Sequence, residues 1–493
     1  MKKIVIAADL GASGGKMAKG YFDGSILKVD DFYDFPNEPM DLNGNLYWDL
    51  FGLYNSIRNG ISYYAKDSEV ESVAVDSWGA SYGFLDEKGR LLEPIYHYRD
   101  LRTEYTMKRM YEILPKRQLF EMTGCQPARS YTLPQLYSYV ERHERIIDLA
   151  DKMLFLPDLL EYFLSGEIAT ERSIAGTSGL LRPDQQDWAY EVFDIFGIQK
   201  RMLTPISDAG IQRGSLLRNV GQSTGAGNAK VIASVGHDTA SAVAGIPGFG
   251  VGQVYISIGT NINMGIELTE NVTSEKAYRG GYKNAAVMED RNILYRDFSA
   301  FWLLNELRRT WKEEGKEYSY QVIMDMAQSR ESKGIYVDVD DVSLNNAGGN
   351  TKEKINAYLQ KTGQPRLQEE GDFVRCILES IALKVKYCTE YFTKELHIPL
   401  HRVSVINGGT RNYVLMQMFS DALGMPVYCG LPYATLVGNV LTQMYALGEV
   451  RTVDEMRELS DRSFRMKEYL PGTDTKERWD ADLWKMTEKG ICK

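Results

Sequence analysis

The chain has 493 residues, of which 44% are hydrophobic and 25% are charged, so it can bury the cores of two domains. Its formal net charge of −10 argues against a nucleic-acid partner, because binding a phosphate backbone requires clustered lysine and arginine. No segment approaches the ~18 consecutive apolar residues of a membrane span, and the apolar run at residues 4–8 is too short for a signal peptide. The five cysteines are scattered without a Cys-x-x-Cys motif, which is typical of a reduced, cytoplasmic chain.

The expected elements alternate between strands and helices along the chain. Residues 4–9 are apolar and β-branched, and a glycine-rich turn and a second strand follow, ending at the hairpin-turn pair Asp23-Gly24. Residues 101–164 are mostly helical in pattern, and residues 374–392 repeat apolar side chains every three or four positions, as an amphipathic helix does. This alternation predicts an α/β fold. The other segments expected to form strands are 17–22, 73–76, 231–235, 254–258, 264–267 and 403–406.

The second half of the chain starts much as the first half does. An apolar strand at 254–258 runs into Gly259-Thr260 and then into a second strand, which matches the strand, glycine turn and strand of the N-terminus. Residues 245–250 (Gly-Ile-Pro-Gly-Phe-Gly) are the best candidate for a boundary between the halves. The sequence therefore predicts two domains of duplicated architecture, at residues 1–244 and 245–493.

A candidate phosphate-binding turn lies between the first two strands. Asp9 ends the first strand, and the backbone N–H groups of residues 11–15 can converge on one point, which suits phosphate oxygens. Lys16 could neutralise phosphate charge, and Asp9 could hold Mg²⁺ directly or through water. The segment lacks the Walker pattern, and a plain hairpin with a glycine turn is the alternative.

The same segment also fits an unrelated pattern. Residues 11–15 match the Gly-x-Ser-x-Gly elbow of the α/β-hydrolases, in which the nucleophilic serine lies between a strand and a helix. Here a strand is expected after the serine instead, and no earlier strands exist to build the sheet beneath it. A serine hydrolase is therefore an alternative that the order of elements disfavours.

A second candidate site is Gly236-His237-Asp238-Thr239, which follows a predicted strand and opens a helix of small residues. Asp238 could simply cap that helix. A carboxylate at the end of a strand can also face a cleft and accept a hydroxyl proton as a general base in phosphoryl transfer. No His-Glu-x-x-His or similar spacing occurs, so we expect no zinc bound by the protein.

Two further sets of residues suit a sugar and a flat ring. Trp78, in Asp76-Ser77-Trp78-Gly79, offers an apolar face beside a carboxylate, as sugar sites do, although a core tryptophan would show the same pattern. Gly408 and Gly409 follow a predicted strand, and their missing side chains would let a flat ring lie against the backbone. A tight strand-to-helix turn is the alternative at these glycines.

Taken together, these residues resemble the FGGY family of carbohydrate kinases, and within it the rhamnulokinases. The most specific matches are Asp76-Ser77-Trp78-Gly79 and the run from His237 to Val243. The matching segments follow the family's order along most of the chain. The others are residues 9–13, Tyr98 to Thr103, Gly259-Thr260, residues 301–304, and Gly408-Gly409 with residues 421–424.

The resemblance implies two ribonuclease-H-like domains of the actin type, with ATP, Mg²⁺ and a small sugar meeting in an interdomain cleft. It implies that Asp238 activates the primary hydroxyl of a ketose, most simply L-rhamnulose, to give the 1-phosphate. The residues that it places around ATP are Ala12, Ser13, Gly14, Gly15, Lys16, Thr260, Asn305, Gly408 and Gly409. Those that it places around the sugar are Trp78, Gly79, His237, Asp238, Thr239 and Asp297, with Asp9 at the metal.

Three positions depart from the rhamnulokinase pattern. Asn261 stands where tryptophan is usual, Asp297 where asparagine is common, and Asn305 where glutamine is common. L-fuculose, L-xylulose or another 6-deoxyketose or pentulose therefore remains an alternative sugar. An actin-like binding module that uses a nucleotide but no sugar is the alternative from another class, and the segments around Trp78 and Asp238 count against it.

Overall fold

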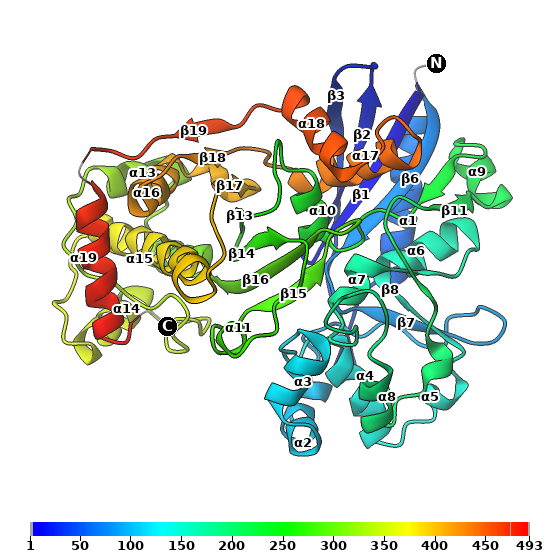
Figure 1. The fold of residues 1–493 in the computed structure, drawn as a ribbon, viewed down its shortest axis with the longest axis horizontal. Coiled ribbons are helices and arrows are strands. Elements are labelled where there is room, and N and C mark those ends of the chain that lie inside the picture. The colour runs from blue at the N-terminus through cyan, green and yellow to red at the C-terminus, as the bar shows by residue number, and fades with distance from the viewer. Residues whose placement is uncertain (1–2, 474, 492–493) are drawn as a thin grey trace. The chain divides into compact units, whose positions relative to one another are not determined.

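The computed structural model describes residues 3–473 and 475–491, which belong to two compact units (Figure 1). Unit 1 comprises Met1–Val251, Leu268–Leu294 and Tyr433–Arg465, and unit 2 comprises Gly252–Glu267, Tyr295–Pro432 and Met466–Lys493. Unit 1 thus takes in two segments from the second half of the chain. The expected division into domains at residues 1–244 and 245–493 stays a prediction.

Unit 1 is built on a mixed sheet. Its strands in spatial order are β11 (Gln212–Ser215), β12 (Lys230–Ile232), β6 (Glu69–Ser77), β1 (Lys3–Gly11), β2 (Gly14–Phe22) and β3 (Leu27–Pro36). β1 and β2 form an antiparallel hairpin around the glycine turn, whereas β6 pairs in parallel with both β1 and β12. The strands predicted at 4–9, 17–22 and 73–76 are confirmed.

The strand predicted at residues 231–235 is shorter than expected, because β12 ends at Ile232. Beyond it, side chains replace ladder partners. The N–H of Gly236 donates to the carboxylate of Glu171, and the N–H of His237 donates to the hydroxyl of Ser173. The chain therefore leaves the sheet before it reaches Asp238.

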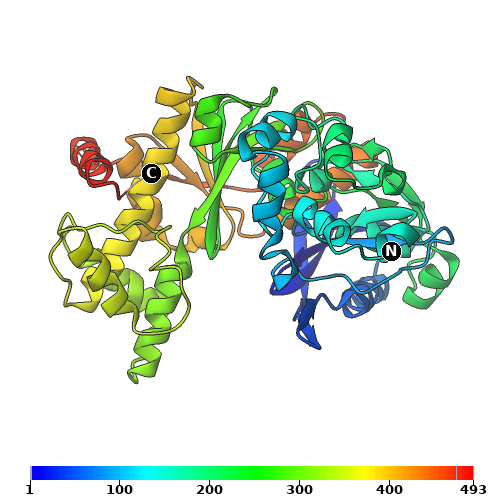
Figure 2. The same ribbon diagram turned by 90° about the horizontal axis from the view of Figure 1, so that it is seen from below.

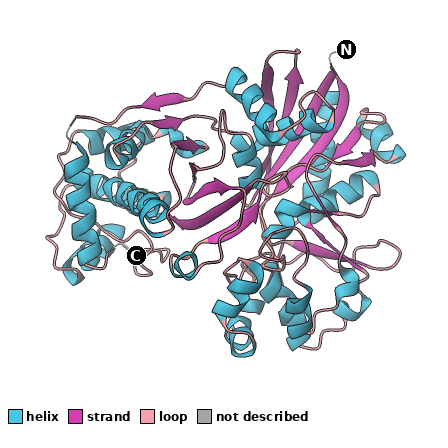
Figure 3. Cartoon of the chain, viewed as in Figure 1, coloured by secondary structure: helices cyan, strands magenta, loops and turns pink. Residues whose placement is uncertain are grey.

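Helices cover both faces of this sheet, and small strand pairs lie beside it (Figure 3). The segment predicted to be mostly helical at 101–164 contains α2 to α6, with one strand between α5 and α6. The helices of unit 1 are α1 (Leu50–Ala65), α2 (Thr106–Ile113), α3 (Lys116–Thr123), α4 (Thr132–Glu141), α5 (Ile146–Leu149), α6 (Leu156–Ser165), α7 (Arg172–Gly176), α8 (Tyr190–Ile195), α9 (Arg218–Thr224), α10 (Asp238–Ala244), α11 (Glu275–Arg279), α17 (Ala434–Ala446) and α18 (Val453–Ser463). Its other strands are β4 (Met40–Leu42), β5 (Asn45–Tyr47), β7 (Tyr82–Leu85), β8 (Lys152–Phe155), β9 (Thr170–Glu171), β10 (Ile206–Ser207) and β15 (Lys283–Ala286).

The alternation of side chains along β1 and β6 gives the sheet of unit 1 two different faces. Ile6 of β1 and Val73 of β6 join a buried apolar core with α1 and α6 on one face. On the opposite face, Val5 and Gly20 lie against Val440 of α17. α10 packs beside α17 on that second face. Asp9, four residues after Val5, therefore faces the layer formed by α10 and α17.

Unit 2 repeats this architecture on a second mixed sheet. After the edge strand β15, its strands in spatial order are β16 (Asn292–Ser299), β14 (Asn261–Leu268), β13 (Gln253–Ile258), β17 (Arg402–Ile406), β18 (Val427–Cys429) and β19 (Lys467–Tyr469). β13 and β14 form an antiparallel hairpin and β13 pairs in parallel with β17, just as β1 pairs with β2 and β6. The predicted strands at 254–258, 264–267 and 403–406 are confirmed, and so are the α/β class and the duplicated architecture.

The long amphipathic helix predicted at 374–392 is α15, which packs against both α13 and α16 in unit 2 and is the long yellow helix of Figure 2. The predicted helix that stops before Gly424 is α16, and Gly424 takes the left-handed conformation that ends it. The helices of unit 2 are α12 (Phe301–Glu313), α13 (Tyr320–Gln328), α14 (Thr351–Lys361), α15 (Glu370–Glu390), α16 (Tyr413–Leu423) and α19 (Thr475–Glu488).

Two expectations from composition concern membranes and thiols. None of the helices in the described part of the chain is long and apolar enough to cross a membrane. The described cysteines are buried and form no disulfide with one another, and the fifth, Cys492, lies outside the described residues.

Candidate active site

Two carboxylates lie side by side where β1 and β6 end. Asp9 and Asp76 are directly paired in the parallel β1–β6 ladder, so the sheet itself brings their side chains together. Asp76 is completely buried, and its Oδ2 accepts a 2.6 Å hydrogen bond from Nδ2 of Asn439 on α17. Asp76 appeared in the sequence only as a neighbour of Trp78, whereas the register makes it a partner of Asp9.

Burial raises the pKa of both carboxyl groups. The pKa of Asp9 rises to about 7 because Asp9 is buried and because the charge of Asp238 is near, while a hydrogen bond from Asp76 and the charge of Lys16 oppose the rise. Burial raises the pKa of Asp76 well above its usual range, and the charge of Asp9 adds to this effect. Each of the two carboxyls is therefore harder to ionise than an exposed aspartate, because both are buried and each charge would lie beside the other.

The glycine turn between β1 and β2 opens into a hollow of about 510 Å³. A Cβ atom at Gly15 would lie 2.1 Å from the ring of Phe35, so this backbone and this ring fit together only without a side chain. Lys16 reaches into the hollow and pairs with Asp34 of β3. The lining residues are Asp9, Gly11, Ser13, Gly14, Gly15, Lys16, Asp34, Phe35 and Pro36.

The structure of the same turn contradicts the alternative that the chain is a serine hydrolase. β2 begins at Gly14, directly after Ser13, and continues to Phe22. A nucleophile elbow requires a helix at this point. Residues 11–15 therefore match the motif in sequence but do not form a nucleophile elbow.

Asp238 is the first residue of α10, and His237 occupies the N-cap position, so the carboxylate is not the N-cap residue. Its Oδ1 accepts hydrogen bonds from the N–H and the hydroxyl of Thr239, at 2.5 and 3.1 Å. Nε2 of His237 lies 3.5 Å from the same oxygen. Within the described residues Oδ2 accepts no hydrogen bond, and 31% of the Asp238 side chain is exposed. One carboxylate oxygen is thus available to a ligand.

The loop before Asp238 is tied to the end of β6. The carbonyl of Gly236 accepts a 2.9 Å hydrogen bond from the N–H of Ser77, which precedes Trp78. The carboxylate of Glu171 holds Gly236 from the other side at 3.0 Å. Since the charge of Asp238 also raises the pKa of Asp9 and of Asp76, the three carboxyls form one cluster in unit 1.

An aromatic wall, formed by Trp48, Trp78, His97 and Tyr98, lies beside this cluster. The ring centroids of Trp48 lie 4.1 Å from those of Trp78 and 3.9 Å from those of His97, and His97 lies 4.7 Å from Tyr98. Both indole N–H groups donate to Oγ of Ser81. Burial raises the pKa of Tyr98 and the charge of Asp238 contributes, so the wall extends into the field of that carboxylate.

Sequence reasoning singled out Trp78 and the segment that begins at Tyr98, but it missed Trp48 and His97. Trp48 precedes α1 by two residues and has no motif around it, so it looks like any core tryptophan. Gly79 follows Trp78, and a Cβ atom there would lie 2.6 Å from Cβ of Thr177. The glycine is required by this close approach.

The remaining predicted residues belong to unit 2. Thr260 lies in the turn between β13 and β14, and its carbonyl accepts hydrogen bonds from the N–H groups of Ala300 and Trp302, at 3.3 and 3.1 Å. These bonds fix the turn to the start of α12, which carries Asn305. Oδ1 of Asn305 accepts a 3.1 Å hydrogen bond from the hydroxyl of Tyr320.

Gly409 and Asp297 have defined neighbours within unit 2. A Cβ atom at Gly409 would lie 2.3 Å from Ile258 on β13, two residues before Thr260, whereas one at Gly408 would meet open space. Asp297, on β16, accepts a 2.6 Å hydrogen bond from Nδ2 of Asn263. Unit 1 thus brings the carboxylates, the glycine turn and Trp78 together, and unit 2 brings Thr260 close to the helix of Asn305 and to Gly409.

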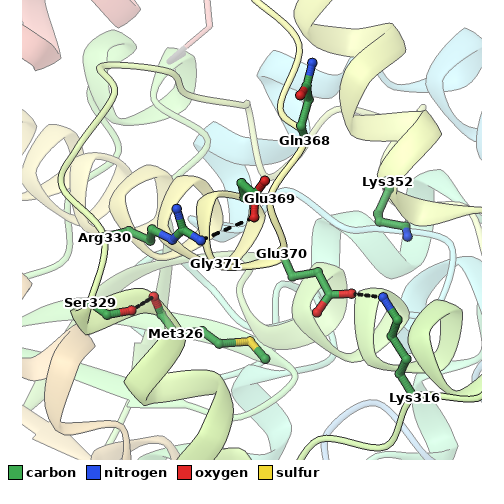
Figure 4. Close-up of a pocket in the computed structure, with 9 residues that line it drawn as sticks. All are labelled: Lys316, Met326, Ser329, Arg330, Lys352, Gln368, Glu369, Glu370 and Gly371. Atoms are coloured by element: carbon green, nitrogen blue, oxygen red, sulfur yellow. Dashed lines mark hydrogen bonds and ion pairs between the residues drawn. The ribbon is translucent and has the colours of Figure 1, made fainter.

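A second hollow, of about 380 Å³, lies in unit 2 at the start of α15 (Figure 4). Its cationic side chains are already paired: Lys316 with Glu370, Arg330 with Glu369, and Lys352 with Glu314. It contains none of the predicted site residues. Its lining is Lys316, Met326, Ser329, Arg330, Lys352, Gln368, Glu369, Glu370 and Gly371.

Comparison with solved structures identifies the fold. A xylulose kinase from Lactobacillus acidophilus superimposes with a TM-score of 0.84 at 14% identity, over 99% of this chain and 97% of that one. A glycerol kinase from Plasmodium falciparum, solved with ADP, superimposes with a TM-score of 0.82 at 16% identity, over 100% of this chain and 99% of that one. The expected fold of ribonuclease-H-like, actin-type domains is confirmed.

Comparison with family models and curated sequences identifies the family. The N-terminal domain model of the FGGY family of carbohydrate kinases matches residues 6–245, and the C-terminal domain model matches residues 254–447. A rhamnulokinase of Bacteroides thetaiotaomicron is 33% identical over 482 residues, which is 98% of each chain. A rhamnulokinase of Bacillus subtilis is 28% identical over 470 residues, or 95% of each chain. The chain therefore belongs to the FGGY family of carbohydrate kinases and is a sugar kinase with ATP as its co-substrate.

Proposed function

We propose that this sugar kinase transfers the γ-phosphoryl group of ATP to the 1-hydroxyl of a ketose, and that the ketose is L-rhamnulose. The observation that carries the proposal is the placement of Asp238, which has one free carboxylate oxygen and lies in the same cluster as Asp9, beside the aromatic wall. The similarity to rhamnulokinases over nearly the whole chain supports this choice of sugar.

In this proposal Asp238 is the general base. Its free Oδ2 accepts the proton of the sugar hydroxyl as the hydroxyl oxygen forms its bond to the γ-phosphorus, and ADP leaves with the electrons of the bond that breaks. Thr239 holds Oδ1, so that the carboxylate keeps one orientation. General-base catalysis of this kind contributes about 10²–10⁴-fold to the rate.

Unit 1 and unit 2 each contain residues that we propose to bind the nucleotide. Backbone N–H groups of Ala12 to Gly15, together with Lys16, would hold phosphate oxygens at the 510 Å³ hollow, with Thr260 contributing from the equivalent turn of unit 2. Asn305, Gly408 and Gly409 would bind the nucleoside.

Asp9 would hold Mg²⁺ in this arrangement, and the residues fit that ion. Within the described residues, no group of three or more His, Cys, Asp and Glu side chains is arranged to hold a metal by itself. Mg²⁺ commonly binds one or two carboxylates and completes its shell with phosphates and water. Asp9 is a buried carboxyl whose pKa is raised by burial and by Asp238, so a cation beside it would relieve that unfavourable charge. When bound with ATP, Mg²⁺ would neutralise phosphate charge.

The proposed sugar site uses Trp78 and Gly79 at the aromatic wall, with His237, Thr239 and Asp297. An apolar ring face suits the methyl end of a 6-deoxy sugar, and polar groups near Asp238 suit its hydroxyls. The departures at Asn261, Asp297 and Asn305 bear on the choice of sugar more than on phosphoryl transfer, so L-fuculose and L-xylulose belong in the same test.

The test is a coupled assay of ADP release with a panel of ketoses, run on the wild-type chain and on Asp238→Asn. We expect L-rhamnulose to give the highest kcat/KM. We expect Asp238→Asn to lower kcat by at least about 10²-fold while ADP binding stays within about twofold, because the amide cannot take the proton. Wild-type turnover in Asp238→Asn would refute the base, a different best ketose would correct the sugar, and no response to any ketose would favour the actin-like binding module.

A further inference from the structure

Helix α17 carries two side-chain amides into the interior of unit 1. Asn439 and Gln443 are four residues apart, so they lie on one face of the helix, and both are completely buried. Buried amides cost free energy unless they are hydrogen-bonded, and Val440 and Leu441 show that this helix also packs with apolar side chains. The two amides therefore require an explanation that the site residues above do not supply.

The amides form one continuous chain of hydrogen bonds that ends at Asp76. Oγ of Ser72 donates to Oε1 of Gln443 at 2.6 Å, Nε2 of Gln443 donates to Oδ1 of Asn439 at 2.9 Å, and Nδ2 of Asn439 donates to Oδ2 of Asp76 at 2.6 Å. Nε2 of Gln443 also donates to the carbonyl of Ile6 at 3.0 Å, so the chain contacts β1 as well as β6. Since each amide both donates and accepts, its orientation is fixed by its partners. Asp76 is thereby held in one position beside Asp9.

The same helix also fixes the helix that begins at Asp238. α10 and α17 approach so closely that a Cβ atom on Gly438 would lie 1.8 Å from the carbonyl oxygen of Ser241. The hydroxyl of Ser241 donates to the carbonyl of Thr435 at 3.0 Å. Gly438 and Asn439 are adjacent in sequence, so neighbouring residues of α17 contact α10 and Asp76.

We propose that Asn439 and Gln443 are positioning residues for phosphoryl transfer, holding Asp76 so that Asp9 and Asp238 keep a fixed separation. This inference rests on the proposed role of Asp238 and adds a requirement to it. Neither amide contacts a substrate in this proposal, because both act through Asp76. A displacement of about 1 Å at reacting groups can lower a rate by about 100-fold, so the loss of one bond at Asp76 should be measurable.

The test removes one side chain of the hydrogen-bond series at a time from the full-length protein. The variants are Asn439→Ala, Gln443→Met and Ser72→Ala. Steady-state kinetics use ATP and the best ketose of the panel. We expect kcat to fall by about 100-fold, about 10-fold and less than about threefold in that order, with both KM values within about threefold of wild type. The order follows the number of hydrogen bonds between each side chain and Asp76. A role in folding alone would not produce it.

Thr442→Val is the matched control. Thr442 is completely buried on the same helix, and its hydroxyl donates to the carbonyl of Gly438 at 2.8 Å, outside the chain that reaches Asp76. We expect this variant to lower the thermal unfolding midpoint about as much as Ser72→Ala does, because each loses one buried hydrogen bond, and to keep kcat within about twofold of wild type.

Two results would overturn the inference: normal kcat in Asn439→Ala and Gln443→Met, or losses of kcat that simply follow the unfolding midpoint across all four variants. If Asn439→Ala does not fold, Gln443→Met and Ser72→Ala decide by the same comparison with the control. Asp238→Asn is assayed in parallel. Turnover retained there refutes the proposed base, whereas an inactive Asp238→Asn beside unaffected amide variants refutes only the positioning role.

Discussion

Ser81 connects the two tryptophans of the aromatic wall, and its truncation tests how the wall is held. Oγ of this residue, which is 1% exposed, accepts the indole N–H of Trp48 at 3.1 Å and that of Trp78 at 2.8 Å. Ser81→Ala leaves both buried indole donors without an acceptor, and each unsatisfied donor costs about 1–3 kcal/mol. We therefore expect the free energy of unfolding to fall by about 2–6 kcal/mol, the sum of those two penalties.

The assay is urea unfolding followed by tryptophan fluorescence, with Ser138→Ala as the control. Ser138 is equally buried, but its hydroxyl makes a single 2.6 Å bond to the carbonyl of Gln135, so its loss should cost about 1 kcal/mol. Because Trp78 belongs to the proposed sugar site, Ser81→Ala should also raise the KM for the ketose while leaving the KM for ATP unchanged. A stability loss no larger than that of Ser138→Ala would refute the reasoning, because the indoles would then have other partners.

Two further predictions concern the packing around the site. Burial and the charge of Arg99 lower the pKa of His97 to about 4, so the folded protein binds this proton less tightly than the unfolded chain does, and stability should be full above about pH 6.5 and fall as the pH drops toward 4. The variant His97→Asn keeps an acceptor for the N–H of Arg99, and it should flatten that part of the plot of urea midpoint against pH. An unchanged slope would assign the acid sensitivity to other groups. Gly438→Ala would place a Cβ atom 1.8 Å from the carbonyl oxygen of Ser241, so it should lower the midpoint in a circular-dichroism melt by more than Thr442→Val does, and an equal or smaller shift would show that α10 and α17 can separate without cost.

The strand pairs at the start of each unit were predictable because their signals are local. Apolar β-branched runs, glycines between them and Asp23-Gly24 all lie within about twenty residues, and β1 and β2 follow them closely. The parallel pairing of β1 with β6 was not predictable from the same signals, because it joins residues some seventy positions apart. That pairing is what makes Asp76 the partner of Asp9.

The residues of the candidate site also divide into those with a local sequence signal and those without one. Asp9, Asp238 and Trp78 stand in recognisable runs at the ends of strands, so the sequence could indicate them. Trp48 could not be indicated, because a lone tryptophan before a helix has no pattern of its own. The strand at 230–232 is shorter than its sequence signal predicts. The reason is distant in sequence, because the buried side chain of Glu171, some sixty residues earlier, accepts the N–H of Gly236 that a sheet partner would have accepted.

Helix α17 shows that dividing the sequence into two halves does not divide the residues of this site in the same way. Residues 434–446 lie within the match to the C-terminal family model, which ends at 447, yet they belong to unit 1. There α17 covers the face of the sheet that carries Asp9, and it supplies the amide bonded to Asp76. A substitution at Asn439 would thus change the C-terminal sequence domain while acting on carboxylates of the N-terminal sheet. The proposed positioning role therefore depends on a contact between parts of the chain more than three hundred and sixty residues apart.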